Sequence, residues 1–150
     1  MKNLIKTFVQ NTQDSNNSIA SLALRVPAGI IFAAHGAQKL FGWFGGYGLQ
    51  GTAGWMESIG LTPGIPLTLM AGGAEFFGGL ALILGFLTRP AAAALAFAML
   101  VAIFSVHFEN GLFMSNNGYE FGLALLAASV SLLFSGAGKV SVDALISRKH

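Results

Sequence analysis

The sequence contains no cysteine and few charged residues. Of its 150 residues, 9% are charged and 54% are hydrophobic, whereas soluble domains carry about 25% charged residues. Without cysteine there is no thiol nucleophile, disulfide, CxxC redox pair or cysteine-ligated iron–sulfur cluster. The net charge of +2 is scattered along the chain, and nucleic-acid binding needs clustered Lys and Arg. The composition therefore predicts a membrane protein that does not bind nucleic acid.

Long apolar segments favour an all-α fold, because no alternation of period two competes with them. A membrane-spanning helix needs about 20 mainly apolar residues. Segments 18–41, 65–87, 90–108 and 119–135 meet or nearly meet this length, and the last is the shortest. The sequence therefore predicts a four-helix transmembrane bundle over residues 18–138, with an outer loop at 42–64. Residues 1–17 form a polar tail in this scheme, and residues 139–150 form a tail at the membrane interface.

The distribution of Lys and Arg predicts the orientation. Four crossings place both termini on one side of the membrane. That side holds six of the basic residues and the other side holds only Lys39; the six are Lys2, Lys6, Arg89, Lys139, Arg148 and Lys149. Both termini are therefore expected in the cytoplasm.

The outer loop is rich in aromatic and glycine residues. Trp43, Phe44, Tyr47 and Trp55 are suited to the headgroup region of a bilayer. Residues 52–59 are expected to form a short helix that lies on the surface. Two interpretations stay open, an aromatic anchor in the membrane interface and a lid over a site.

Polar residues in the apolar segments follow helical spacing. Arg25, His35 and Lys39 share one stripe of the first helix with Phe32. The second and fourth helices carry stripes of small residues, with Glu75 beside the one at Ala71, Ala74 and Gly78, and Glu120 in line with Ala124 and Ser131. Membrane helices pack through small residues, so these polar side chains are expected to point into the bundle.

Depth estimates group these residues. At about 1.5 Å per residue, His35 lies roughly 24 Å from the cytoplasmic start of the first helix, at a depth similar to that of Lys39, His107 and Glu120. These four are expected to meet in a polar pocket near the outer leaflet. Arg25 and Glu75 lie deeper, and we expect them to form an ion pair, since an isolated charge in a bilayer costs at least about 2.5–3.5 kcal/mol. Simpler interpretations stay open as well. Arg25 and Glu75 can be a purely structural pair, and Lys39 can extend to the lipid headgroups. The two histidines can be separate interfacial residues, and Glu120 can be favoured by its place at a helix N-terminus.

Four stretches resemble the DoxX family of small membrane proteins. They are LALRVPAGIIFAAHGAQKLFG (22–42), GGAEFFGGLALILGFLTRPAA (72–92), NNGYEFGLALL (116–126) and GAGKVSVDAL (136–145). The resemblance implies a four-helix protein of the bacterial cytoplasmic (inner) membrane. It also implies quinone-linked or other redox work with a partner protein, since the family is named after relatives of thiosulfate:quinone oxidoreductase subunits.

The leading functional hypothesis is a membrane subunit of a quinone-linked oxidoreductase system. His35, Lys39, His107 and Glu120 are the candidate catalytic residues, and Arg25, Glu75, His35 and Trp55 are the candidate cofactor-binding residues. The cofactor is expected to be quinone, and the electron source an external redox partner, soluble or in the membrane.

Three alternatives stay open. Haem b held by His35 and His107 is a less favoured cofactor, and a zinc site is less favoured still because its third ligand would have to be Glu109 or Glu120. No metal is therefore assigned. A non-enzymatic scaffold or chaperone-like protein would use the loop around Trp55 to contact its partner. A transporter would need more room than four short helices offer, so this alternative requires a homo-oligomer.

Overall fold

The computed structural model describes residues 15–147, with side chains from residue 18 onward, and every regular element in that range is helical. Residues 1–14 of the predicted tail (1–17) and the last three residues of the C-terminal tail lie outside the described residues. The longer helices are α2 (Ser15–Phe41), α4 (Gly64–Leu84), α5 (Thr88–Ala102) and α6 (Glu120–Ser135). Shorter helices are α3 (Gly48–Ser58) and α7 (Val142–Ser147), with turns η2 (Trp43–Gly45), η3 (Ile103–His107), η4 (Phe108–Asn110) and η5 (Met114–Asn116).

Three of the four predicted crossings are long and apolar enough to span a bilayer. They are Ser18–Phe41, Gly64–Leu84 and Thr88–Asn110, the last of which runs through α5 and the turns η3 and η4. With 16 residues, α6 is about 24 Å long, which is less than the roughly 30 Å of a hydrocarbon core. The fourth crossing and the cytoplasmic position of the termini stay predictions.

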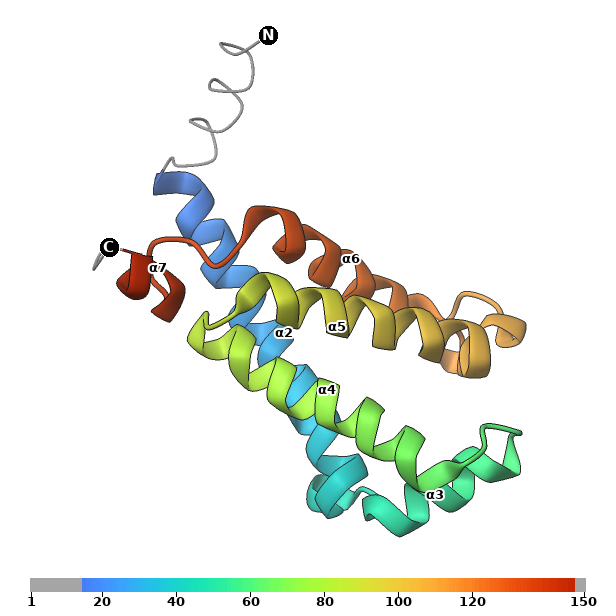
Figure 1. Ribbon diagram of the computed structural model, residues 1–150. Helices are drawn as coiled ribbons and strands as arrows, with labels where there is room; N and C mark the ends of the chain where they lie inside the picture. The colour runs from blue at the N-terminus through green and yellow to red at the C-terminus, as the bar shows by residue number, and fades with distance from the viewer. Residues whose placement is uncertain (1–14, 148–150) are drawn as a thin grey trace, which may run out of the picture.

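The four longer helices form two pairs, α2 with α4 and α5 with α6 (Figure 1). The pairs lie close together at one end of the molecule and spread apart toward the other. We call the first end the terminal end, because the start of α2 and the segment after α6 meet there, with the Lys139 N–H donating to Ser18 Oγ at 2.7 Å. The other end, which holds α3 and residues 108–119, is called the far end. A core of large side chains connects the pairs, centred on Phe32, Leu82, Leu95 and Leu132.

Glycines bring α2 and α4 into backbone contact. A Cβ atom added at Gly29 would lie 2.6 Å from the carbonyl oxygen of Gly79, and one at Gly36 would lie 2.7 Å from that of Gly72. Such contact needs glycine, since any side chain would hold the backbones apart. The predicted inner stripe of α2 is confirmed at Arg25 and Phe32, which are both 1% exposed. On α4, however, Gly72 and Gly79 contact α2, whereas Gly78 lies against Leu95 of α5.

The predicted inner face of α6 is wrong. Ala124, Ser131 and Ser135 are exposed, and the buried residues of this helix are Leu125, Ser129 and Leu132. Ser129 can be buried because its hydroxyl donates to the Leu125 carbonyl at 2.8 Å, which satisfies the hydroxyl within the helix. Leu125 and Leu132 belong to the same core cluster as Leu95 and Met99 of α5, so the inner face of α6 is formed mainly by leucines.

Arg25 is a structural residue of the terminal end, and the expected Arg25–Glu75 ion pair is wrong. Its guanidinium is 1% exposed and donates to the carbonyls of Leu82 at 2.9 Å, Ile83 at 2.7 Å and Ala137 at 3.0 Å, and also to that of Val140. The carbonyls at the end of α4 lack the N–H partner four residues later that an interior carbonyl has, and that of Leu82 accepts one other bond, from the Gly85 N–H at 3.2 Å. Arg25 therefore caps α4 and fastens the segment after α6 to it.

Asp143 caps the start of α5, as Arg25 caps the end of α4. Its two carboxylate oxygens accept hydrogen bonds from the N–H groups of Leu87, at 2.8 Å, and Thr88, at 3.0 Å. A carboxylate is favourable at a helix N-terminus, because the first N–H groups have no partner in the helix and the helix dipole is positive there. Residues 136–147 therefore close the terminal end of the bundle.

We expect Asp143→Ala to lower the free energy of unfolding by about 1 kcal/mol, the usual cost of losing an N-terminal cap. Thermal unfolding of the purified protein in detergent measures this change. The matched control is Ser147→Ala, on the exposed end of the same helix, which should leave the midpoint within error. Equal midpoints for both variants would show that Asp143 does not cap α5.

The short helix predicted at 52–59 is present as α3, and it starts earlier than expected. Thr52, Ala53 and Met56 are buried, and the Met56 sulfur accepts a hydrogen bond from Thr68 at 3.4 Å. The Gly64 N–H donates to the Glu57 carboxylate at 2.9 Å, which ties α3 to the start of α4. The loop aromatics are exposed; they are Trp43, Phe44, Tyr47 and Trp55.

Candidate functional site

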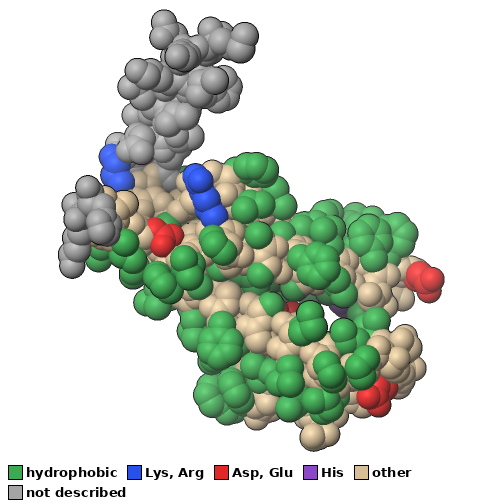
Figure 2. Space-filling view, viewed as in Figure 1, with side chains coloured by type: hydrophobic (Ala, Val, Ile, Leu, Met, Phe, Trp, Pro, Cys, Tyr) green, Lys and Arg blue, Asp and Glu red, His purple; other side chains and the backbone are tan. Residues whose placement is uncertain are grey.

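The spread between the helix pairs leaves a cavity of about 170 Å³ toward the far end. All four longer helices and the loop before α6 line it. Figure 2 shows a hollow between α4 and α5 in this region, with acidic and histidine atoms inside it. The lining residues are Phe32, His35, Lys39, Glu75, Met99, Ala102, His107, Met114, Asn117, Gly118, Phe121, Gly122 and Leu125. Three of the four residues predicted to meet at one depth lie around this cavity, namely His35, Lys39 and His107.

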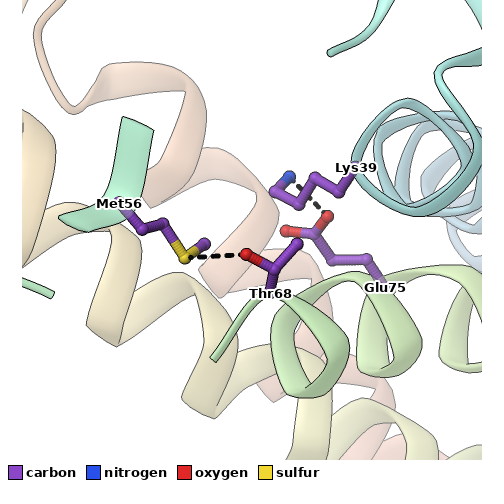
Figure 3. Close-up of polar contacts among 4 residues, drawn as sticks. All are labelled: Lys39, Met56, Thr68 and Glu75. Carbon is purple, nitrogen blue, oxygen red and sulfur yellow. Dashed lines mark hydrogen bonds and ion pairs between the residues drawn. The ribbon is translucent and has the colours of Figure 1, made fainter. Parts of the chain in front are cut away.

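Lys39 and Glu75 form an ion pair in the wall of the cavity. The Lys39 ammonium lies 2.6 Å from Oε2 of Glu75, and their side chains are 25% and 6% exposed. Figure 3 shows the two side chains pointing toward each other from α2 and α4. The glycine contacts between these helices produce the pair, because a Cβ at Gly72 would lie 3.2 Å from Cβ of Lys39. Pairing offsets much of the cost of burying each charge.

His35 lies one helical turn before Lys39 and is exposed to the cavity. Its ring packs against Phe121 of α6, with 6.0 Å between the ring centroids. Within residues 15–147 neither ring nitrogen has a hydrogen-bond partner. Both nitrogens are therefore available to a ligand.

His107 enters the cavity from the π-helical turn η3 that extends α5. Its Nδ1 lies 2.9 Å from the carbonyl oxygen of Asn117. A carbonyl only accepts hydrogen bonds, so Nδ1 carries a proton and the neutral ring has its lone pair on Nε2. Single π-helical turns within α-helices are frequent at functional sites. His107 thus offers one oriented nitrogen.

Three predicted site residues do not line the cavity. Arg25 lies at the terminal end, as described above. Oε1 of Glu120 accepts a hydrogen bond from the Met114 N–H at 2.7 Å, so its carboxylate holds the loop before α6. Trp55 is 42% exposed on α3. The predicted convergence of Glu120 with the histidines is therefore wrong, and Trp55 is not among the residues that line the cavity.

A family comparison identifies the chain. The family model described as DoxX matches residues 20–108, which is more than half of the sequence. The chain belongs to the DoxX family.

Relatives of this DoxX protein are found in several bacteria. It is 34% identical over 139 residues to Inner membrane protein YqjF of Escherichia coli K12, which covers 87% of this chain and 95% of the relative. The chain is 32% identical over 128 residues to a Bacillus subtilis protein named Putative oxidoreductase CatD. This match covers 85% of the chain and 87% of the relative. It also matches an uncharacterised protein of Haemophilus influenzae at 37% identity over 81 residues, where the match spans about half, 54%, of each chain. No solved structure matches the chain at a significant level.

The family and the apolar helices together establish the location. This DoxX protein is an inner-membrane protein with three candidate spanning helices in the part of the chain that the structure describes. Side chains of all three candidate spanning helices line the cavity.

Metal and haem fit the site poorly. Among residues 15–147 no group of three or more His, Asp or Glu side chains is close enough to hold a metal ion, and the carboxylate of Glu120 is directed to the loop. A cavity of about 170 Å³ holds one ring and not the four pyrroles of a haem. The donors that remain suit a small ring with polar substituents.

The sequence prediction missed the walls of this site. Phe121 and the backbone around Asn117 face His35 and His107. The spacing of Phe121, Leu125, Ser129 and Leu132, with steps of three or four residues, could have indicated the inner face of α6. The prediction followed the small residues of that helix instead.

Proposed function

We propose that this DoxX protein is the membrane subunit of a quinone-linked oxidoreductase system and that the cavity binds the quinone ring. The observation that carries the proposal is the presence of an ion pair and two histidines around one small cavity in an apolar bundle. The name of the CatD relative favours redox work in the same way. Polar groups in a membrane interior are costly, and they are usually kept for function.

The size of the cavity suits one six-membered ring. An apolar cavity of roughly 150 Å³ binds benzene in another protein, and the cavity here measures about 170 Å³. Phe32 and Phe121 line it together with the histidines. Aromatic side chains stack on flat rings in offset or edge-on arrangements. The walls are therefore suited to a planar head group.

The polar groups complement the oxygens of a quinone or quinol. A quinone carbonyl accepts hydrogen bonds, and Lys39 and His35 can donate them. A quinol hydroxyl donates, and Nε2 of His107 can accept. The described residues provide no donor to Oε1 of Glu75, whose partner oxygen holds Lys39, so Oε1 can accept too. The site thus has groups for both redox forms.

Reduction of a quinone to a quinol adds two electrons and two protons. His35 and the Lys39–Glu75 pair can exchange protons with the ring oxygens from their places in the wall. The chain has no cysteine, so it supplies neither thiol electrons nor a cysteine-held cluster. A redox partner protein, in the membrane or soluble, therefore delivers the electrons.

The proposal includes an orientation. With α6 as a fourth, short crossing, the terminal end faces the cytoplasm and the far end faces outward. Arg89 and Lys139 at the terminal end support this arrangement through the positive-inside rule. The quinone site then lies in the outer half of the membrane.

We expect His35→Ala to weaken quinone binding about tenfold, because one hydrogen bond to a ring oxygen is worth roughly 1–1.5 kcal/mol. Titration of the purified protein in lipid nanodiscs with a short-tailed benzoquinone measures the dissociation constant. The matched control is Gln38→Ala, on the same turn of α2, whose side chain bonds to the Phe44 carbonyl at 3.2 Å and does not line the cavity.

The outcome separates the proposal from the scaffold alternative. Equal affinity for the His35→Ala variant and the wild type would place quinone elsewhere. Absence of binding to the wild type, with loss of a co-purifying partner protein in Trp55→Ala, would favour a scaffold that uses the surface of α3.

A further inference from the structure

The cavity opens on the flank of the molecule. Figure 2 shows the hollow between α4 and α5, at the place where the helix pairs diverge, and apolar atoms surround it. Both helices belong to candidate membrane spans. The hollow therefore faces the acyl chains of the bilayer.

A hydrogen-bonded turn, residues 111–120, forms part of the cavity wall toward the far end, and we call it the outer turn. The N–H groups of Tyr119 and Glu120 donate to the carbonyls of Gly111, at 3.0 Å, and Leu112, at 2.8 Å. The Glu120 carboxylate holds the Met114 N–H from the other side. Gly118 is buried, and a Cβ there would lie 2.6 Å from the Phe113 carbonyl oxygen. Met114 and Asn117 of this turn line the cavity, so the turn restricts access to the cavity from this direction.

The outward faces of α4 and α5 are apolar. Large hydrophobic side chains on them are between 39% and 68% exposed; they are Leu69, Met70, Phe77 and Leu80 on α4 and Phe97, Leu100 and Val101 on α5. Exposed apolar surface of this extent on a membrane-embedded bundle contacts lipid tails. A hydrocarbon chain that leaves the hollow would meet similar surroundings.

We propose that the ligand enters the cavity from the lipid phase between α4 and α5, and that it is a quinone with a hydrocarbon tail, dissolved in the membrane, and not a water-soluble ring compound. This inference rests on the proposed function. The cavity has room for the ring alone, so the tail of a bound quinone must leave through the opening. The outer turn forms the wall toward the far end, and the hollow between α4 and α5 is an opening that Figure 2 shows, so the flank is the route for the ring.

Photolabelling of the wild-type protein in lipid nanodiscs tests the route. The probe is a benzoquinone with a ten-carbon tail that carries a diazirine close to the ring. We expect labels on peptides from residues 64–84 and 88–107, and few on the outer turn. An excess of the unlabelled decyl-benzoquinone should reduce the labelling at least about fivefold, and His35→Ala should reduce it similarly.

Two other results would overturn the inference in distinguishable ways. Labelling that the decyl-benzoquinone displaces, but that falls mainly on residues 111–120, would keep the quinone site and reject the route through the flank. Labelling that nothing displaces would reject the quinone site itself.

A membrane-impermeant competitor provides a second readout. A tailless benzoquinone sulfonate should protect the protein at least about tenfold less well than the decyl-benzoquinone at equal total concentration. Equal protection by both would show that water-soluble rings reach the cavity past the outer turn, and the inference would then be wrong.

Discussion

Arg25→Ala should lower the thermal unfolding midpoint in detergent by on the order of 10 °C, which corresponds to a loss of about 3–5 kcal/mol. The guanidinium donates to four carbonyls, two at the end of α4 and two in the segment after α6. Each buried carbonyl left without a partner costs about 1–3 kcal/mol. The terminal end should then separate, and trypsin should cleave at Lys139 faster than in the wild type.

Arg89→Ala is the matched control for this prediction. Arg89 is exposed and makes one hydrogen bond of 3.3 Å, to the Phe134 carbonyl, so its loss should change the midpoint little. Arg25→Lys should recover only part of the stability, because one ammonium has three donors at a single atom and cannot reach carbonyls on two segments. Equal midpoints for the two alanine variants would refute the structural role of Arg25.

Gly36→Ala should disrupt the contact between α2 and α4 and with it the candidate site. The new Cβ would lie 2.7 Å from the Gly72 carbonyl oxygen and from Cα of Phe76, and closer still to the Phe76 nitrogen. All of these atoms belong to the backbone, so the helices must move apart. Overpacking costs about 1–3 kcal/mol and sometimes more. The separation also moves Lys39 away from Glu75, so quinone affinity and thermal stability should fall together.

Gly73→Ala offers a sharp comparison on the same helix. A Cβ at this position meets no atom within 4 Å, and alanine favours a helix over glycine by about 0.5–1 kcal/mol. The midpoint should therefore stay the same or rise. Unfolding midpoints and quinone affinities of both variants, measured in one preparation series, check the pair. The account of helix packing fails if Gly36→Ala behaves like Gly73→Ala.

The long helices and the grouping of three cavity residues follow from the sequence alone, because apolar length and helical spacing carry that information. His35, Lys39 and His107 were grouped by counting residues along each helix, and the structure places all three around one cavity. Counting works for these residues because all three lie near the same end of their helices, where the helix pairs diverge around the cavity.

Counting residues along each helix could not predict that Glu75 pairs with Lys39 and not with Arg25. The predicted second helix ran to residue 87, but α4 ends at Leu84, and Gly85 takes a left-handed conformation with φ of 65°. The earlier end leaves carbonyls free beside Arg25, which binds them instead of a carboxylate. Glu75 is then opposite the far part of α2, where Lys39 reaches it. Which charges meet depends on where a helix ends and on backbone contact at glycines, and neither is visible in residue spacing.

Glu120 shows a second limit. Counting residues predicts that Glu120 lies at the depth of the histidines. The depth of a residue does not determine the direction in which its side chain points around the helix axis. The outer turn folds back so that its Met114 N–H meets the carboxylate. A turn of this kind depends on the left-handed Asn117 and the buried Gly118, and the spacing of residues along a helix carries no information about such a turn.

The most direct test of the quinone site is the infrared spectrum of a benzoquinone with ¹³C-labelled carbonyls, bound to the protein in lipid nanodiscs. Hydrogen bonds from Lys39 and His35 should shift at least one carbonyl band to lower frequency than in lipid alone. The double variant Lys39→Met/Glu75→Gln should weaken that shift while the protein stays folded, since removing both partners of a buried pair is often tolerated. Carbonyl bands identical to those in lipid alone would contradict the account.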